Sequence, residues 1–204
     1  MSKILAVCLV LAMASVSLAA EPGLIGSWEA DTDGWVAIGT NVIVPGLPYG
    51  VTQGAGSLGL VANNGWTQVM QKEWGGWWQE TPFSNPTILT FDLTMIASEW
   101  VVAEGEWVQP LESIIMAGPN NWWNQISHHV DWNPVVDGDK TFHVSIALPG
   151  VGIGTQFQAM TFVTNSSATI AQRGVIYLDN MMIPEPATMA LMGLGGLALI
   201  RRKK

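Results

Sequence analysis

Hydrophobic and polar residues alternate along two long stretches in the middle of this chain. Between residues 87 and 95, apolar side chains occupy every second position from Leu89 to Met95, and threonine or aspartate stands between them. Residues 141–148 repeat the pattern, with Phe142, Val144 and the later apolar residues on one side. Successive residues of a strand point to opposite faces, so this period of two predicts half-buried β-strands.

Shorter candidate strands cover much of the remaining chain, separated by turn signals such as Asp33-Gly34, Asn64-Gly65 and Pro149-Gly150. No window between residues 21 and 183 has the period of a convincing amphipathic helix. Many short strands at this spacing predict an all-β fold, an antiparallel β-sandwich. The further candidate strands are 24–30, 35–39, 56–62, 66–71, 110–117, 124–130, 158–164 and 174–183.

The N-terminal segment has the pattern of a secretory signal. Lys3 precedes an apolar run from Ile4 to Leu18, and Ser17-Leu18-Ala19 offers the small residues that a signal peptidase accepts. We therefore predict that residues 1–20 form a signal helix that is removed on export.

The C-terminal segment has three parts: Pro184-Glu185-Pro186, an apolar run from Ala187 to Ile200, and the basic residues 201–204. The run has 14 residues. As a helix it spans about 21 Å, less than the ~30 Å hydrocarbon core of a bilayer, so it predicts a transient membrane association. The basic cluster should stay in the cytoplasm, which leaves residues 21–183 outside.

In both its tripeptide and its order of parts, the segment 184–204 resembles the PEP-CTERM sorting signal of bacteria. The resemblance implies recognition by an exosortase, a membrane-embedded cysteine peptidase, with cleavage near the tripeptide and delivery to the outer surface or extracellular matrix. An ordinary tail anchor is the alternative.

The composition of residues 21–183 narrows the possible functions. The chain has 16 acidic and eight basic residues. One acid and five bases lie in the two terminal segments, which leaves 15 acids and three bases in the body. A net charge near −12 repels phosphate and excludes nucleic acid as a partner. The one cysteine, Cys8, falls in the signal, so the mature body has neither disulfides nor thiolate metal sites.

Four stretches of the body carry a second resemblance. They are Ser27–Trp35, Val51–Leu60, Leu89–Leu93 and Gly174–Asn180. Together they resemble a jelly-roll carbohydrate-binding module, which implies a jelly-roll sandwich over residues 21–183. In such modules a structural calcium ion often joins the first strand to the last. The matching positions here are Glu29, Asp31 and Asp179.

All 11 tryptophans lie in the body, and some of them stand beside hydrogen-bonding side chains. An indole stacks on the apolar face of a sugar ring, while amides bond its hydroxyls. This pattern favours a non-catalytic protein that binds polysaccharide; a purely structural or adhesive matrix protein with buried tryptophans is the alternative. The candidate ligand residues are Trp77, Trp78, Trp122, Trp123, Asn124 and His128.

Three acids near two tryptophans raise a weaker alternative, a small glycan-active hydrolase. Glu99, Glu104 and Glu106 lie around Trp100 and Trp107, and glycosidases use paired carboxylates. Their spacing matches no hydrolase motif, and residues 97–107 are typical of an acidic loop. We therefore predict no catalytic residues.

Overall fold

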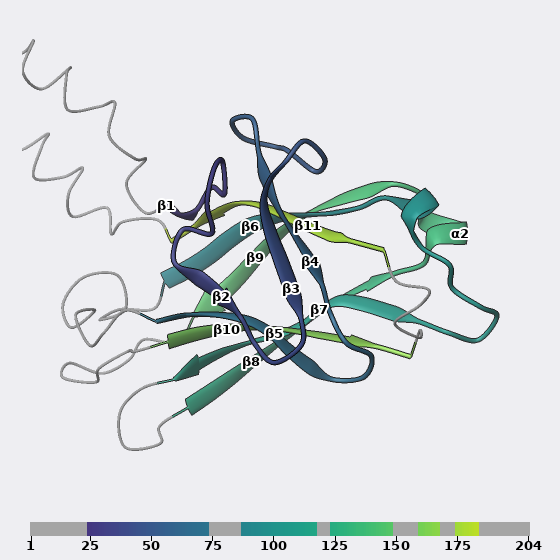
Figure 1. Ribbon diagram of the computed structural model, residues 1–204. Coiled ribbons are helices and arrows are strands. Elements are labelled where there is room, and N and C mark those ends of the chain that lie inside the picture. Colours follow the sequence, from purple (N-terminus) through teal and green to yellow (C-terminus); the bar gives the residue numbers. More distant parts are fainter. Residues whose placement is uncertain (1–23, 74–86, 118–122, 149–158, 168–173, 184–204) are drawn as a thin grey trace, which may run out of the picture.

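A computed structural model describes residues 24–73, 87–117, 123–148, 159–167 and 174–183. Two antiparallel sheets pack face to face (Figure 1). This confirms the predicted β-sandwich, while the predicted terminal helices lie outside the described residues. The strands are β1 (Leu24–Gly26), β2 (Trp35–Ala37), β3 (Val42–Leu47), β4 (Ser57–Val61), β5 (Thr67–Glu73), β6 (Thr87–Met95), β7 (Val108–Ala117), β8 (Trp123–Trp132), β9 (Lys140–Leu148), β10 (Ala159–Ser166) and β11 (Ile176–Met182).

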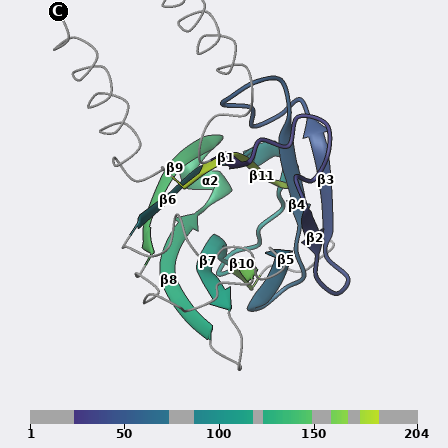
Figure 2. The same cartoon turned by 90° about the vertical axis from the view of Figure 1, so that its left-hand side faces the viewer.

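Sheet A has the strand order β3-β4-β11-β6-β9, with β1 also paired to β11, and sheet B has the order β2-β5-β10-β7-β8. Viewed from the side, sheet A lies above sheet B, with β3 and β2 at one margin and β9 and β8 at the other (Figure 2). Two short helical turns, η2 (Ala97–Glu99) and α2 (Pro134–Asp137), interrupt the strands. Within the described residues, none of the helices has the length and apolar character needed to span a bilayer.

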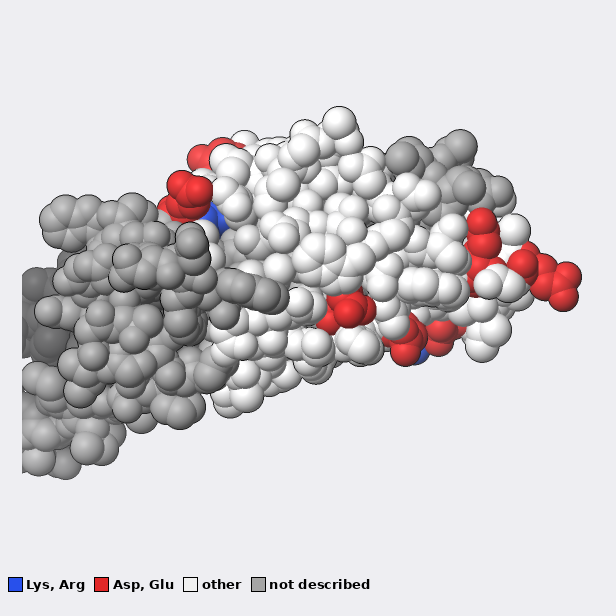
Figure 3. All heavy atoms as spheres, turned by 90° about the horizontal axis from the view of Figure 1, so that it is seen from below, with Lys and Arg blue, Asp and Glu red and all other residues white. Residues whose placement is uncertain are grey.

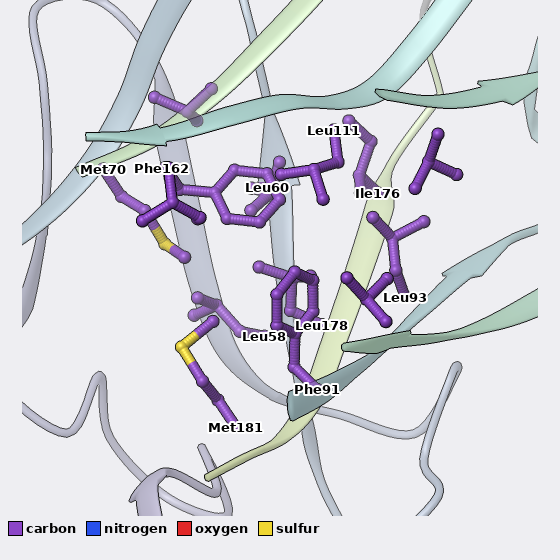
Figure 4. Close-up of a cluster of buried hydrophobic side chains, with 14 of the residues drawn as sticks. Leu58, Leu60, Met70, Phe91, Leu93, Leu111, Phe162, Ile176, Leu178 and Met181 are labelled. Carbon is purple, nitrogen blue, oxygen red and sulfur yellow. The ribbon is translucent and has the colours of Figure 1, made fainter. Parts of the chain in front are cut away.

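The core lies between the sheets and follows the predicted alternation. Leu89, Leu93 and Met95 of β6 are fully buried, and Ile146 of β9 is nearly so. Phe91 meets Phe162 of the opposite sheet edge-on, with ring centroids 5.8 Å apart (Figure 4). Each such side chain removes apolar surface from water on folding, which stabilises the sandwich.

Sequence reasoning missed one strand, β3. Its sequence contains Pro45 and Gly46, both of which are unfavourable inside a sheet. β3 is an edge strand paired only with β4, and the pairing shifts register between Val44 and Leu47. An edge position tolerates proline because the missing N–H would face solvent.

Candidate functional site

The predicted tryptophan ligands fall largely outside the described part of the chain. Trp77, Trp78 and Trp122 are not among the described residues. Trp123 is the first residue of β8, and its side chain is also outside the described part. Their role in ligand binding stays a prediction.

The two other predicted ligand residues lie on β8. Asn124 pairs with Met116 of β7, a core residue, and directly opposed residues share a face. Asn124 is therefore on the inner side of sheet B. His128 is half-buried and lies where the pairing of β8 with β7 shifts register. The pairing thus places Asn124 on the opposite side of sheet B from the outer face described next.

The outer face of sheet B brings together polar side chains that the sequence did not group. In one transverse row, Gln71 of β5 pairs with Thr161 of β10. The row continues through Ile115 of β7 to Gln125 of β8. A second row lies two residues further along β10, β7 and β8, and three residues further along β5, where the pairing shifts register. We call the eight residues of the two rows the amide face: Gln71, Thr161, Ile115, Gln125, Gln68, Val163, Ser113 and Ser127.

The centre of the amide face is buried and its margins are open. Ile115 and Val163 are 7% and 0% exposed, yet neither belongs to the core cluster between the sheets. Gln68 and Ser127 are exposed on either side. The Gln125 amide donates a hydrogen bond to the Ser113 hydroxyl, at 3.1 Å. Thr161 and Ser113 at the centre are also buried, at 5% and 0% exposed, so the face presents its accessible hydrogen-bonding groups at the margins.

Two half-exposed tryptophans stand at one end of this face. Trp66 directly precedes β5 and is 46% exposed, and Trp107 directly precedes β7 and is 45% exposed. The end of β10 lies between them: Gly65 N–H donates to the Ser166 carbonyl, and Trp107 exchanges backbone and hydroxyl bonds with Ser167. Alternation along β5 and β7 places both indoles on the outer side.

Sequence reasoning did not single out Trp66 or Trp107 as ligands. Their immediate neighbours resemble those of Trp28 and Trp35, which are 0% and 1% exposed. Only the position at a strand's start, next to the end of β10, separates the open rings from the buried ones.

No residue of the amide face is itself charged, but the Gln71 amide donates a hydrogen bond to the Glu73 carboxylate, at 2.9 Å. Seen from below, uncharged residues make up most of the described surface, with acidic side chains in a few separate groups (Figure 3). Lys72 of β5 lies on the inner side, where it donates to the carbonyls of Ile25 and Asp33 at 2.9 and 2.6 Å. Burial lowers the pKa of Lys72, and the carboxylates of Asp33 and Asp31 partly oppose that effect. A cavity of about 200 Å³ adjoins this lysine and β1.

On the outer face of sheet A, Asp179 anchors the loop between β3 and β4. Its carboxylate is fully buried and accepts hydrogen bonds from the backbone N–H groups of Thr52 and Gln53, at 2.6 and 2.7 Å. The Thr52 hydroxyl also donates to Asp92, the cross-strand neighbour of Asp179. Charged acceptors of this kind make strong hydrogen bonds, so the loop is fixed at its centre.

The predicted calcium residues are only partly brought together. The Glu29 carboxylate accepts a hydrogen bond from the Ala55 N–H, in the loop held by Asp179. The Asp31 carboxylate instead accepts one from the Asp33 N–H, within its own turn. No group of three or more histidine, cysteine or acidic side chains in the described segments could hold a metal ion. However, Gln53 and Asn180 donate their backbone N–H groups to Asp179, and the side-chain oxygens of both residues are buried without a hydrogen-bond partner. Such orphan oxygens fit a hard cation, since calcium takes carboxylate and amide oxygens.

The three acids considered for catalysis lie in the loop between β6 and β7, as expected. The Glu99 carboxylate accepts a hydrogen bond from the Tyr177 hydroxyl, at 2.8 Å. Glu106 accepts from the Ala103 N–H in an exposed turn, and Glu104 is exposed. Two of these carboxylates therefore have structural hydrogen bonds within the loop or to the neighbouring strand.

Comparison with known proteins assigns the C-terminus. Residues 183–204 match the model of the PEP-CTERM protein-sorting motif, which confirms the resemblance of the tail. The motif implies export, surface sorting and processing by an exosortase. A comparison of the sequence with curated proteins found no match.

The body is similar to solved carbohydrate-binding modules. One is a family 27 module of Caldicellulosiruptor saccharolyticus in complex with mannohexaose, at 15% identity and a TM-score of 0.52, covering 81% of this chain and 97% of that one. Another is the C-terminal family 22 module of Clostridium thermocellum Xyn10B, at 11% identity and a TM-score of 0.50, covering 81% of this chain and 96% of that one. A third structure was solved to explain the promiscuous specificity of carbohydrate-binding modules from the β-sandwich superfamily. It has 14% identity and a TM-score of 0.54, and the match covers 81% of this chain and 63% of that one. At these identities the likeness establishes the fold.

The Tyr177–Glu99 contact predicts a difference in alkaline stability. Burial, together with the hydrogen bond and charge of Glu99, raises the pKa of Tyr177 above 10.0. In the unfolded chain the phenol ionises near pH 10, so only the unfolded state releases the proton there. The free energy of unfolding contributed by this group is complete below about pH 10 and falls as the pH rises further.

Between pH 9 and 11, the free energy of unfolding of Tyr177→Phe, measured by urea denaturation, should therefore decline less steeply than that of wild type. Lys72 is present in both proteins, so its effect cancels in the comparison. Tyr49→Phe, at the other tyrosine, is the control and should keep most of the wild-type decline. Parallel curves for wild type and Tyr177→Phe would contradict the role assigned to this contact.

Proposed function

We propose that this protein is exported, sorted to the cell surface or matrix through its PEP-CTERM tail, and binds a neutral polysaccharide there without cleaving it. The observation that carries the proposal is the amide face with Trp66 and Trp107 at its end. Amides can bond sugar hydroxyls in the plane of the ring, and an open indole can stack on its apolar face.

The electrostatics of the body favour a neutral ligand. Lys72 points inward, and Lys140 of β9 is paired with Asp137 at 2.9 Å, away from sheet B. The described part of the amide face thus offers no cation to an acidic sugar, and the acidic body repels one. Neutral chains such as xylan or mannan suit this surface better than uronic-acid polymers.

The strand order also supports the proposal. Strands β4 to β11 divide as β4-β11-β6-β9 and β5-β10-β7-β8, the order of a jelly roll. One of the similar modules was solved with mannohexaose, so mannan is a first ligand to test. A structural or adhesive protein without glycan binding remains the second function to compare.

We further propose that a calcium ion stabilises the loop at Asp179. The buried carboxylate and the unpartnered oxygens of Gln53 and Asn180 would supply ligands, with Glu29 nearby in the same loop contact. The ion would compensate oxygens that now lack donors.

Affinity electrophoresis of residues 21–183 in neutral and anionic polysaccharides tests glycan binding. We expect retardation by a neutral chain and none by an anionic one. Trp66→Ala or Trp107→Ala should each weaken binding by about 2- to 12-fold, since an aromatic contact contributes about 0.5–1.5 kcal/mol. Tyr49→Ala is the matched control, because Tyr49 is similarly exposed (55%) but packs on Tyr177 of sheet A. No retardation of a folded protein would favour the structural alternative.

Thermal unfolding with calcium and with chelator tests the cation. Calcium at about 100 times its Kd should add about 2.7 kcal/mol to the free energy of unfolding, which is readily seen as a raised Tm. Asp179→Asn should unfold earlier and lose the response, whereas Asp131→Asn, at an exposed acid of β8, should keep it. A wild-type Tm that ignores both calcium and chelator would contradict the proposal.

A further inference from the structure

The edge strands of the two sheets differ in how far they discourage pairing with another chain. β1 and β2 have only three residues each. β3 contains Pro45 and shifts register before Leu47, and β8 shifts register twice along β7. Short length, proline and irregular pairing all keep a strand from accepting a further neighbour. These edges are therefore poor templates for association.

The edge strand β9 has none of these features. Its nine residues, Lys140–Leu148, include neither proline nor glycine. It pairs with β6 from Thr87↔Leu148 to Met95↔Lys140 without a shift of register, and within the described segments it has no second neighbour. It lies at one margin of the sandwich (Figure 2). Its other side is therefore a regular row of backbone donors and acceptors about 30 Å long.

The side chains of β9 also leave room for a further strand. The only lysine, Lys140, is the first residue of the strand, and its ammonium is paired with Asp137 at 2.9 Å. The His143 ring is held by Asp92, with 2.5 Å between Nδ1 and Oδ1. No lysine, arginine or acid therefore stands in the middle of β9, where such a charge would repel a second strand. The exposed residues that alternate with the inner ones are Thr141, His143, Ser145 and Ala147.

We propose that two copies of this protein associate by antiparallel pairing of β9 with the β9 of a second copy, about a two-fold axis at Val144. In this register all nine residues of each strand are paired. Residues on the inner side of one strand oppose inner residues of the other, so the two sheets A join into one continuous sheet.

The occupant is a second copy because the sequence of β9 is self-complementary in this register. On the inner side, Phe142 faces Ile146 of the second copy, an aromatic residue against a β-branched one. On the outer side, His143 faces Ser145 of the second copy. The two Lys140 side chains lie at opposite ends of the pair, so like charges do not oppose each other. Sorting to the surface also gathers copies of the chain in one layer, which favours their pairing.

The pair places both sheets B on the same side of the joined sheet A, because the inner sides of the two strands adjoin. Two amide faces then lie on one particle, and a polymer that reaches both binds with avidity. The association itself requires no ligand. Failure of glycan binding leaves it standing, and a monomeric protein leaves the proposed glycan binding untouched.

Introduced cysteines test the contact and its register. We use the full chain in a mild detergent, with Cys8→Ser to remove the single native thiol. Thr141→Cys and Ala147→Cys are made in separate chains, because these two positions oppose each other across the axis. On oxidation the mixture should give a cross-linked heterodimer. Each chain alone should not cross-link, since the two copies of one position lie about 20 Å apart. Equal cross-linking in either chain alone, or none in the mixture, would overturn the inference.

Sedimentation of the full chain measures the strength of association. We expect a monomer–dimer equilibrium that follows concentration. Ser145→Lys should weaken it about 2- to 30-fold, because the axis places each new lysine opposite His143 of the other copy. Val42→Lys is the matched control, since it makes the same charge change at an exposed position (51%) of the edge strand β3. A wild type that stays monomeric at every concentration, or equal association of the two lysine variants, would contradict the proposal.

Discussion

The fold depends on the pairing of its last strand in the middle of sheet A. β11 lies between β4 and β6 and also pairs with β1, so three strands from across the chain meet on one segment of seven residues. Leu178 and Met181 of β11 are fully buried in the core. Because these contacts are distant in sequence, the sandwich is complete only when the C-terminal strand has been made and paired. The match to the sorting-motif model begins at Ile183, the residue after that strand.

The outer faces of the two sheets differ in what covers them. The outer face of sheet A is covered in part by the loop between β3 and β4, which Asp179 and Asp92 hold through Thr52 and Gln53. The outer face of sheet B, which we propose as the binding face, has amides around a small buried centre and two half-exposed indoles at one end. The residues of the amide face are uncharged, and the acidic residues around them, such as Glu73 beside Gln71, disfavour an anionic ligand. Under the proposed function, a chain with few cations would recognise a neutral polymer through its shape and hydroxyl groups.

Local pattern was sufficient to predict the regular strands. The alternation at residues 87–95 and 141–148 reappears as β6 and β9, in register from Thr87↔Leu148 to Met95↔Lys140. It failed at β3, where Pro45 and Gly46 hid an edge strand. The sorting tail was predictable because its signal is a short linear sequence. The amide face was not, because Gln71 and Gln125 lie 54 positions apart and meet only through the order of strands in sheet B.

The most direct test of the account is nuclear magnetic resonance of residues 21–183 during titration with a neutral oligosaccharide such as mannohexaose or a xylan fragment. Side-chain amide and indole N–H signals report separately on Gln68, Gln71 and Gln125 and on Trp66 and Trp107. Saturable shifts that concentrate on these groups, with the ligand intact afterwards, are the predicted result. Shifts confined to sheet A, or none with any neutral glycan, would contradict the assignment of sheet B as the binding face.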